Sequence, residues 1–290
     1  MANLHYTFAS APSLPRREAE LLLAHVAGRP REWVMAHPEA ELTAEQRRQF
    51  ESLAARAAAG TPLPYLLGHW EFFGLDFRIT PGVLIPRPET ELLVETALNL
   101  ARNSNFKIQN SKLLDVGTGS GIIAVTLAIK LPAAQIIATD NSAAALAVAK
   151  TNAEAHGVAD RITFIQSDLL SAFRISHSAF DLVCANLPYI ATAELEALAV
   201  ARHEPGAALD GGPDGLRLIE PLLAAAPARL NPGGALLAEI AAGQGPAAFA
   251  LARRYFPEAK CEVRADLAKK DRLLVIQMLN SQFSMHNCPL

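Results

Sequence analysis

The fold class of this chain follows from one run of residues, Leu114-Asp115-Val116-Gly117-Thr118-Gly119-Ser120-Gly121-Ile122. The run passes from an apolar segment into a turn with three glycines and then into a second apolar segment. Glycine adopts positive φ values without strain and lets a ligand approach the main chain. The run therefore predicts a strand, a ligand-binding turn and a helix, in that order.

Strand and helix patterns alternate on the C-terminal side of this run. Short apolar runs separated by segments with helical spacing are typical of a doubly wound parallel sheet. We expect strands at residues 113–116, 135–139, 162–166, 180–185 and 235–240, and helices at 121–129, 143–155 and 216–226. Two last runs, 261–265 and 272–278, are separated by a short polar turn and predict an antiparallel hairpin at the sheet edge.

The N-terminal part has a helical pattern. Apolar residues recur at helical spacing between Pro15 and Gly28, and Thr43 with Gln46 forms a capping box at the start of a second helix. The segments that we expect are a helical bundle at 1–67, a hairpin linker at 68–85, an α/β domain at 86–280 and a disordered polar tail at 281–290.

Composition excludes several classes of protein. The chain has 26 Lys and Arg against 29 Asp and Glu, a net charge of −3, so no global basic field attracts nucleic acid. The three cysteines are far apart and the histidines lack metal-ligand spacing, so we expect neither a disulfide nor a metal site. Since we find neither an apolar run long enough to span a membrane nor a secretory signal, we expect a cytoplasmic protein without membrane contact.

The glycine turn predicts the class of cofactor. A dinucleotide fingerprint requires glycine at position 122, where this chain has Ile122, which disfavours a nicotinamide dehydrogenase. A carboxylate at Asp115 repels phosphates and suits a cationic ligand, such as a sulfonium with its α-ammonium group. We therefore expect S-adenosylmethionine to contact Asp115 and the turn residues, which are Gly117, Thr118, Gly119, Ser120 and Gly121.

Two further acidic residues follow predicted strands. Asp140 ends the second strand, where a carboxylate can accept from both ribose hydroxyls, and its alternative role is to cap the next helix. Asp168 follows the third strand and can accept from the adenine amine, while Leu169 can pack on the ring. Taken alone, Asp168 is better explained as an ordinary loop aspartate. We include all three residues in the predicted cofactor site.

The catalytic prediction rests on Asn186-Leu187-Pro188-Tyr189, which follows the fourth predicted strand. An amide or aniline-like nitrogen is a poor nucleophile because its lone pair is delocalised. The Asn186 side-chain oxygen and the Leu187 carbonyl can accept both of its hydrogens, which orients the nitrogen and stabilises the growing positive charge. Pro188 would hold the turn and Tyr189 would stack on the planar substrate group. Asn186 would also border the cofactor; at an arbitrary position the tetrapeptide would be a simple β-turn.

A glycine-rich segment follows the predicted catalytic residues. It reads Asp210-Gly211-Gly212-Pro213-Asp214-Gly215 and either closes over the substrate or only connects two elements.

Longer motifs resemble one family, the release-factor glutamine methyltransferases (PrmC or HemK). The resemblance runs from about Pro15 to Ile276. Its most specific part is the run from Val83 to Leu92, Val-Leu-Ile-Pro-Arg-Pro-Glu-Thr-Glu-Leu. Further matches are Glu204-Pro205, Ala208-Leu209-Asp210-Gly211-Gly212, Glu239-Ile240 with Gln244, and Asp266-Leu267 with Asp271-Arg272.

The resemblance implies a Rossmann-like class I methyltransferase sheet preceded by a helical domain that helps to dock a release factor. It implies methyl transfer from S-adenosylmethionine to the glutamine of the GGQ loop in class-1 peptide-chain release factors. Gly117–Gly121 and Asp140 would hold the cofactor, and residues 186–189 align with the family's NPPY motif. We expect a monomer that does not bind nucleic acid directly.

One residue departs from the family pattern. Leu187 stands where the family usually has proline, and the same spelling occurs in ribosomal-RNA adenine dimethyltransferases. A main-chain carbonyl remains at position 187, so the proposed hydrogen bonds survive. The alternatives are an adenine amino-methyltransferase acting on RNA or DNA, which predicts a basic stripe with stacking aromatics, and a noncatalytic cofactor-binding protein, which predicts a degraded tetrapeptide.

Overall fold

The computed structural model describes residues 14–102, 111–173 and 179–279. The chain divides into two compact units, Met1–Trp70 and Glu71–Leu290. Each unit is described by itself below.

The first unit is a small helical bundle. Its helices are α2 (Arg16–Ala27), α3 (Arg31–Ala36), α4 (Ala44–Ala58) and α5 (Leu63–Leu67). Helix α2 ends at Gly28, which has a φ of 62° and closes the helix with its backbone N–H. The predicted capping box at the start of α4 is confirmed, since Thr43 and Gln46 each accept from the other's backbone N–H. Leu22, Leu23 and Phe50 are fully buried in the core of this bundle.

The second unit is an α/β domain. Its strands are β3 (Lys112–Val116), β4 (Gln135–Asp140), β5 (Ile162–Gln166), β6 (Phe180–Ala185), β7 (Leu230–Glu239), β8 (Lys260–Ala265) and β9 (Asp271–Gln277), and the two-stranded sheet of β1 (His69–Phe72) and β2 (Leu75–Arg78) precedes them. Its α-helices are α6 (Thr90–Arg102), α7 (Ile122–Lys130), α8 (Ala143–Ala155), α9 (Thr192–Leu195), α10 (Ile219–Ala225) and α11 (Gly245–Tyr255). Five short 3-10 helices lie at Ala159–Arg161, Ser171–Phe173, Ala199–Arg202, Gly206–Ala208 and Ala226–Arg229.

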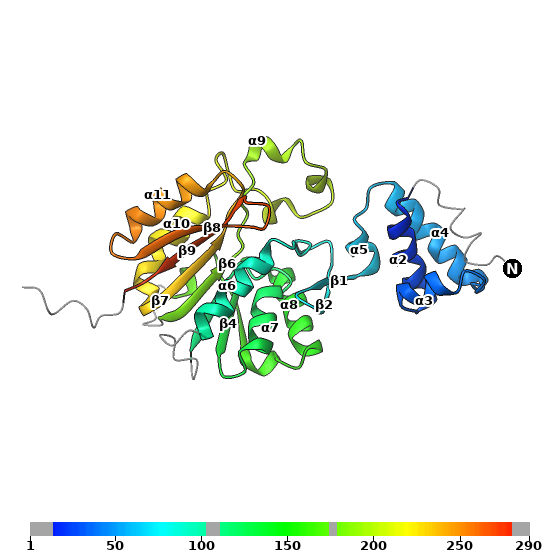
Figure 1. Cartoon of the computed structure of the whole chain (residues 1–290), viewed down its shortest axis with the longest axis horizontal. Helices are drawn as coiled ribbons and strands as arrows, with labels where there is room; N and C mark the ends of the chain where they lie inside the picture. The colour runs from blue at the N-terminus through cyan, green and yellow to red at the C-terminus, as the bar shows by residue number, and fades with distance from the viewer. Residues whose placement is uncertain (1–13, 103–110, 174–178, 280–290) are drawn as a thin grey trace, which may run out of the picture. The chain divides into compact units, whose positions relative to one another are not determined.

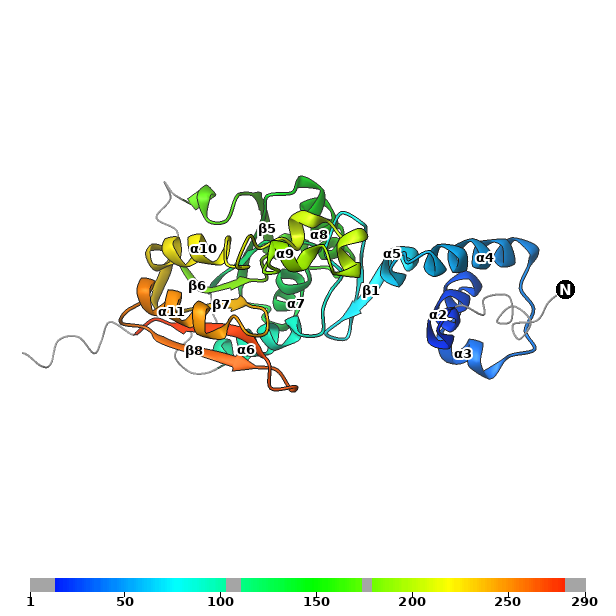
Figure 2. The ribbon, with the colours of Figure 1, turned by 90° about the horizontal axis from the view of Figure 1, so that it is seen from above.

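The seven-stranded sheet has the order β5-β4-β3-β6-β7-β9-β8 (Figures 1 and 2). Strands β3 to β7 pair in parallel, whereas β9 runs antiparallel to both β7 and β8. The predicted doubly wound sheet with an antiparallel edge hairpin is therefore confirmed. The chain winds outward from β3 toward β5 and then from β6 toward β8, so the direction reverses between β3 and β6. Open α/β sheets bind ligands at this point.

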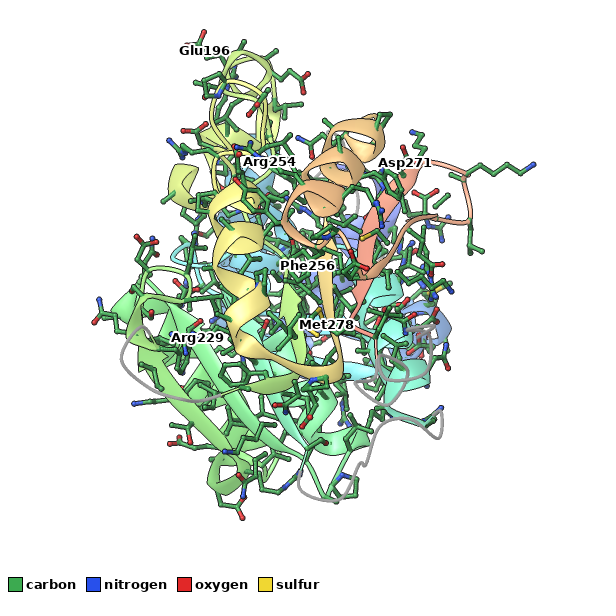
Figure 3. The ribbon with its side chains drawn as sticks, turned by 90° about the vertical axis from the view of Figure 1, so that its left-hand side faces the viewer. Glu196, Arg229, Arg254, Phe256, Asp271 and Met278 are labelled. Atoms are coloured by element: carbon green, nitrogen blue, oxygen red, sulfur yellow. The ribbon has the colours of Figure 1, made fainter. Side chains whose placement is uncertain are left out.

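Helices cover both faces of the sheet because right-handed crossovers in opposite directions place them on opposite sides. Helices α6, α7 and α8 contact one another in one layer, and α10 and α11 form the other. In that second layer Glu220 of α10 accepts from Arg254 at 3.2 Å and from Tyr255 at 3.0 Å on α11. Figure 3 shows the two helices side by side, with Phe256 at the end of α11, where it is buried.

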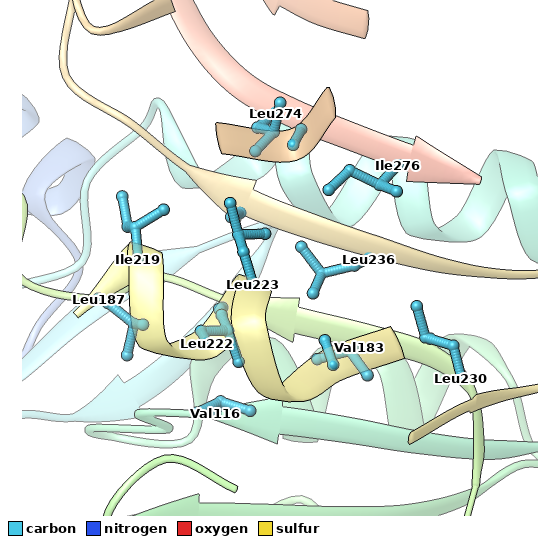
Figure 4. Close-up of a cluster of buried hydrophobic side chains, with 14 of the residues drawn as sticks. Val116, Val183, Leu187, Ile219, Leu222, Leu223, Leu230, Leu236, Leu274 and Ile276 are labelled. Carbon is cyan, nitrogen blue, oxygen red and sulfur yellow. The ribbon is translucent and has the colours of Figure 1, made fainter. Parts of the chain in front are cut away.

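The largest apolar cluster lies between α10 and the sheet (Figure 4). Leu222 and Leu223 of α10 are fully buried there, against Val183 of β6 and Leu236 of β7. The alternating strand and helix pattern of the sequence thus becomes one packed layer. This layer fixes the carboxyl ends of β3 and β6.

Three features differ from the sequence expectations. Helix α11 was not predicted, and β7 begins at Leu230 rather than at residue 235. Strand β3 begins at Lys112 rather than at residue 113, and residues 103–110 and the tail 281–290 lie outside the described residues. Within the described parts of the chain, no helix combines the length and apolar character needed to cross a membrane.

Candidate active site

The glycine turn joins β3 to α7 and is tied to the end of β4. The N–H groups of Gly117 and Thr118 both donate to the carbonyl of Thr139, at 2.8 and 2.9 Å. Gly117, Gly119 and Gly121 have φ values of 73°, 55° and 84°, which side chains rarely adopt. A Cβ at Gly117 would lie 2.9 Å from Leu187, whereas a Cβ at Gly119 would meet nothing within 4 Å. The turn is thus packed on one side and open on the pocket side.

Asp140 lines the pocket and is partly exposed. Its Oδ2 accepts from Gly119 N–H at 2.9 Å and its Oδ1 accepts from Ser142 N–H at 2.9 Å. The cap of α8 is Ser142, whose hydroxyl accepts from Ala145 N–H. The alternative role of Asp140 as that helix cap is therefore wrong, and its carboxylate keeps further lone pairs for a ligand.

Asp168 and Leu169 also line the pocket, beyond the end of β5. Asp168 is exposed, and Leu169 has a φ of 46°, an uncommon value for a residue with a branched side chain. The structure therefore brings both residues together with Asp140 at one wall, as their positions in the sequence predicted.

Asp115 lies beneath the glycine turn and not in the pocket wall. It is 1% exposed, and its Oδ2 accepts from Thr118 Oγ1 at 2.6 Å and from Ala124 N–H at 3.2 Å. Among the described residues, Oδ1 has no hydrogen-bond partner. Burial raises the pKa of Asp115 to about 7, against the two hydrogen bonds that lower it. The structure shows Asp115 supporting the turn, and its predicted contact with the cofactor stays a prediction.

Asn186 follows β6 and lines the pocket. Its Nδ2 donates to the Thr90 hydroxyl at 2.9 Å, which holds the amide group against the first residue of α6. The side-chain oxygen is the other arm of the same carboxamide and remains for a ligand to donate to. Thr90 is fully buried, so this orientation is set by a rigid partner.

Tyr189 has a contact that the sequence did not predict. Its hydroxyl donates to Oε1 of Glu239, at the end of β7, at a distance of 3.0 Å. Burial and the adjoining carboxylate raise the pKa of Tyr189. Tyr189 does not line the pocket, so the predicted stacking of its ring on a substrate stays a prediction.

Leu187 and Pro188 both line the pocket. The Leu187 side chain is 5% exposed and points into the apolar cluster with Ile219 and Leu222 (Figure 4). This packing explains how leucine is accommodated where the family usually has proline, because the side chain enters the core and leaves the main chain at the pocket.

The glycine-rich segment is packed tightly against the tetrapeptide. A Cβ at Gly211 would lie 2.8 Å from the Pro188 carbonyl, and one at Gly215 would lie 2.2 Å from the Tyr189 carbonyl. Gly211 N–H also donates to the Ile190 carbonyl at 2.8 Å. The structure therefore shows a segment that buttresses the tetrapeptide, and the closing motion is not needed to explain its glycines.

An ion pair holds the loop that forms the rim of the pocket. Glu204 is 5% exposed, pairs with Arg87 and accepts from the backbone N–H of Ile85 at 3.0 Å. The pairing joins segments more than a hundred residues apart and places Pro205 in the pocket lining.

The pocket therefore gathers most of the predicted site residues. Those that line it are Gly117, Thr118, Gly119, Ser120, Asp140, Asp168, Leu169, Asn186, Leu187 and Pro188, and those that do not are Asp115, Gly121 and Tyr189. Sequence reasoning missed Thr90, Arg87 and Glu204 as site residues. Their only signal was membership of the motifs that resemble the family.

Comparisons with known proteins show the family of the chain. A family model described as the PrmC N-terminal domain matches residues 7–68, and one described as the methyltransferase small domain matches residues 89–203. A release factor glutamine methyltransferase of Moorella thermoacetica is 45% identical over 259 residues, 89% of each chain. One from Bordetella pertussis is 44% identical over 244 residues, 84% of this chain and 88% of that protein.

A solved structure shares the fold. It is a 16S rRNA N2 G1207 methyltransferase of T. thermophilus in complex with AdoMet and guanosine, with a TM-score of 0.51. It is 19% identical to this chain, and the match covers 72% of this chain and 49% of that one.

Proposed function

The chain belongs to the family of release factor glutamine methyltransferases, and we propose on that premise that it methylates the side-chain amide nitrogen of the GGQ glutamine in class-1 peptide-chain release factors. The methyl donor is S-adenosylmethionine. The observation that carries the proposal is the carboxamide of Asn186, which faces a pocket formed by the glycine turn with its nitrogen already bound to Thr90.

The pocket fits S-adenosylmethionine by its charge. Its charged lining residues are Asp140, Asp168 and Arg87, and Arg87 is paired with Glu204. Two carboxylates beside a glycine turn suit a cationic ligand that carries hydroxyls and an amine, and they repel a pyrophosphate. Asp140 would accept from the ribose and Asp168 from the adenine amine, and the turn would contact the remainder. When bound, the group supplies an electrophilic methyl on a positively charged sulfur.

The tetrapeptide orients the substrate nitrogen. The Asn186 oxygen and the Leu187 carbonyl accept the two hydrogens of the glutamine amide, which fixes the plane of that group. Both acceptors also favour the positive charge that grows on the nitrogen as it forms a bond to carbon. No strong general base is required, because the methylated nitrogen loses its proton readily. Catalysis in this proposal comes mainly from orientation and local electrostatics.

The adenine methyltransferase alternative is not favoured, because the relatives reported above are glutamine methyltransferases over most of the chain. A release factor is therefore the proposed protein substrate. That the chain acts as a monomer and without direct contact to nucleic acid stays a prediction, as do the individual roles of the pocket residues and the docking role of residues 1–67.

A methyl-transfer assay tests the proposal. Purified protein is incubated with S-adenosylmethionine labelled on the methyl group, together with a release factor or with the same factor in which the GGQ glutamine is changed to alanine. Label is expected in the intact factor alone. Equal label in both factors, or label only in added RNA, would contradict the proposal.

A further inference from the structure

Two buried groups hold the tetrapeptide, and the mechanism above uses Thr90 only as the partner of Asn186 and does not use Glu239. Glu239 ends β7 with 2% exposure, and Thr90 begins α6 with none. Glu239 Oε1 accepts from the Tyr189 hydroxyl at 3.0 Å, and Thr90 Oγ1 accepts from Asn186 Nδ2 at 2.9 Å. One residue of the tetrapeptide is thus held by each group.

Thr90 also lies near Glu239, without a formed hydrogen bond between the two side chains. The hydroxyls of Thr90 and Tyr189 both lie close enough to the Glu239 carboxyl to lower its pKa. Oε2 of Glu239 is buried and has no partner of good hydrogen-bond geometry among the described residues, so a small rotation of the Thr90 hydroxyl has an acceptor available. A buried carboxylate oxygen without a donor is costly, which favours this contact.

A hydroxyl has one proton to donate, and this determines the orientation of Asn186. When Thr90 donates to the Glu239 carboxylate, its lone pairs remain to accept from Asn186 Nδ2. The Asn186 oxygen then faces the pocket. If Glu239 is instead protonated or replaced by a donor, it donates to Thr90, and the Thr90 proton becomes free to bind the Asn186 oxygen. The carboxamide then favours the opposite orientation, with its NH₂ group in the pocket, where it cannot accept from a substrate amide.

We propose that Glu239, in its carboxylate form, is a positioning residue that acts through Thr90 to hold the Asn186 oxygen toward the substrate. This inference rests on the proposed function, because it assigns a role to Asn186 as an acceptor. It adds a residue 53 positions along the chain from the catalytic asparagine, and that residue does not line the pocket.

The segment after β7 also holds the main chain of the tetrapeptide. Gln244 Nε2 donates to the Tyr189 carbonyl at 3.0 Å and to the Asp214 carbonyl at 3.1 Å, while its Oε1 accepts from Ala241 N–H at 2.8 Å. Tyr189 is therefore fixed at its hydroxyl by Glu239 and at its carbonyl by Gln244. Both contacts come from the same short segment, as expected of a supporting layer.

The charges around Glu239 place its titration near neutral pH. Burial raises its pKa to about 7, the neighbouring hydroxyls of Thr90 and Tyr189 lower it, nearby Glu89 raises it and Arg272 lowers it. Arg272 lies 2.9 Å from Asp266 and 3.9 Å from Glu89, so its positive charge is shared between these two carboxylates. Since the carboxylate is the positioning form, kcat is expected to fall as the pH is lowered through about 7.

Three variants test the proposal: Glu239→Gln, Thr90→Val and Thr90→Ser. The glutamine replaces the carboxylate with a group that donates, the valine keeps the shape of threonine without the hydroxyl, and the serine keeps the hydroxyl. For each, kcat and KM for a release factor are measured from pH 6 to 9, with the Kd for S-adenosylmethionine and the melting temperature as controls of folding.

We expect Glu239→Gln and Thr90→Val to lower kcat at least tenfold at pH 8, with KM and the cofactor Kd changed less than threefold. The fall of kcat below pH 7 should disappear in Glu239→Gln, and Thr90→Ser should recover most of the activity. Should Glu239→Gln fail to fold, the kinetics of Thr90→Val and the pH profile of the wild-type protein still test the proposal.

A wild-type kcat in Glu239→Gln, or an unchanged pH profile in that variant, would overturn the proposal. So would equal loss in the serine and valine variants at position 90. These outcomes leave the proposed function intact, because wild-type protein still labels the release factor. Absence of any labelling by wild-type protein would instead contradict the proposed function itself.

Discussion

At the scale of single residues, the account depends on the carboxamide of Asn186. The sequence located this residue because it follows a buried strand and precedes a proline and an aromatic residue. The structure adds that its nitrogen is bound to Thr90, which leaves the oxygen as the acceptor. Thr90 and Glu239 were beyond sequence reasoning because each looks ordinary where it stands, and their proximity to residues 186–189 arises only from the packing of α6 and β7 around β6.

Replacing Asn186 by alanine tests its role. We expect Asn186→Ala to lower kcat by about 100-fold or more, the usual effect of removing one preorganised polar contact to the reacting group. The Kd for S-adenosylmethionine should change less than threefold, because the glycine turn and Asp140 remain. Kinetics with a release factor and equilibrium binding of the cofactor measure the two effects.

Asn231→Ala is the matched control. Asn231 donates to Asp181 at 2.7 Å near the start of β7, away from the lining of the pocket. Removal of the Asn231 carboxamide should leave kcat within twofold of the wild-type value. If Asn186→Ala instead abolished cofactor binding while Asn231→Ala did not, Asn186 would belong mainly to the cofactor site.

At the scale of elements, the glycine turn was the best-predicted part of the site. Its three glycines signalled positive φ, and the structure shows φ values of 55° to 84° there. The helix α11 was missed because it begins with Gly245 and Pro246 shortly after Gly243, a pattern more typical of a loop. A Cβ at Gly245 would lie 2.2 Å from Asp271, so tertiary packing and not local propensity explains the glycine.

Two glycines of the turn provide a matched pair. A Cβ at Gly119 meets open space, whereas one at Gly121 would lie 3.0 Å from the Cβ of Ala149 on α8. We expect Gly119→Ala to cost about 1–2 kcal/mol from the left-handed backbone alone. Gly121→Ala should cost more, by about 1 kcal/mol or above, because overpacking is added. Urea unfolding of the cofactor-free proteins measures both, and an equal loss would show that α8 yields without strain.

At the scale of the whole molecule, the chain combines two compact units with different cores. The alternation of strands and helices predicted a doubly wound parallel sheet, and the two closely spaced last strands predicted its antiparallel edge. Both predictions follow from general rules of α/β folds. Which buried carboxyl groups would titrate was not predictable, because burial depends on segments that meet only after folding. Among the described residues, Asp115 and Glu239 are the two carboxyl groups with a pKa raised to about 7.

These carboxyls give stability a dependence on pH. A folded-state pKa above the unfolded value means that the native state holds the proton more tightly. The contribution of each carboxyl to the free energy of unfolding is therefore complete below the unfolded pKa and is lost as the pH rises to about 7. We expect Asp115→Asn to remove the part of this loss that is due to Asp115. The slope of the unfolding free energy against pH should become shallower by up to about 1.4 kcal/mol per pH unit between pH 4 and 7. Urea unfolding of both proteins at several pH values measures the difference. Parallel stability curves would mean that Asp115 titrates alike in the folded and unfolded chains.

The most direct measurement of the central claim is a crystal structure of the protein with S-adenosylhomocysteine and a release-factor peptide that contains the GGQ sequence. We predict the glutamine amide nitrogen within hydrogen-bonding distance of both the Asn186 oxygen and the Leu187 carbonyl. An Asn186 side chain that donates its NH₂ group to the glutamine, or a glutamine bound away from residues 186–189, would contradict the account.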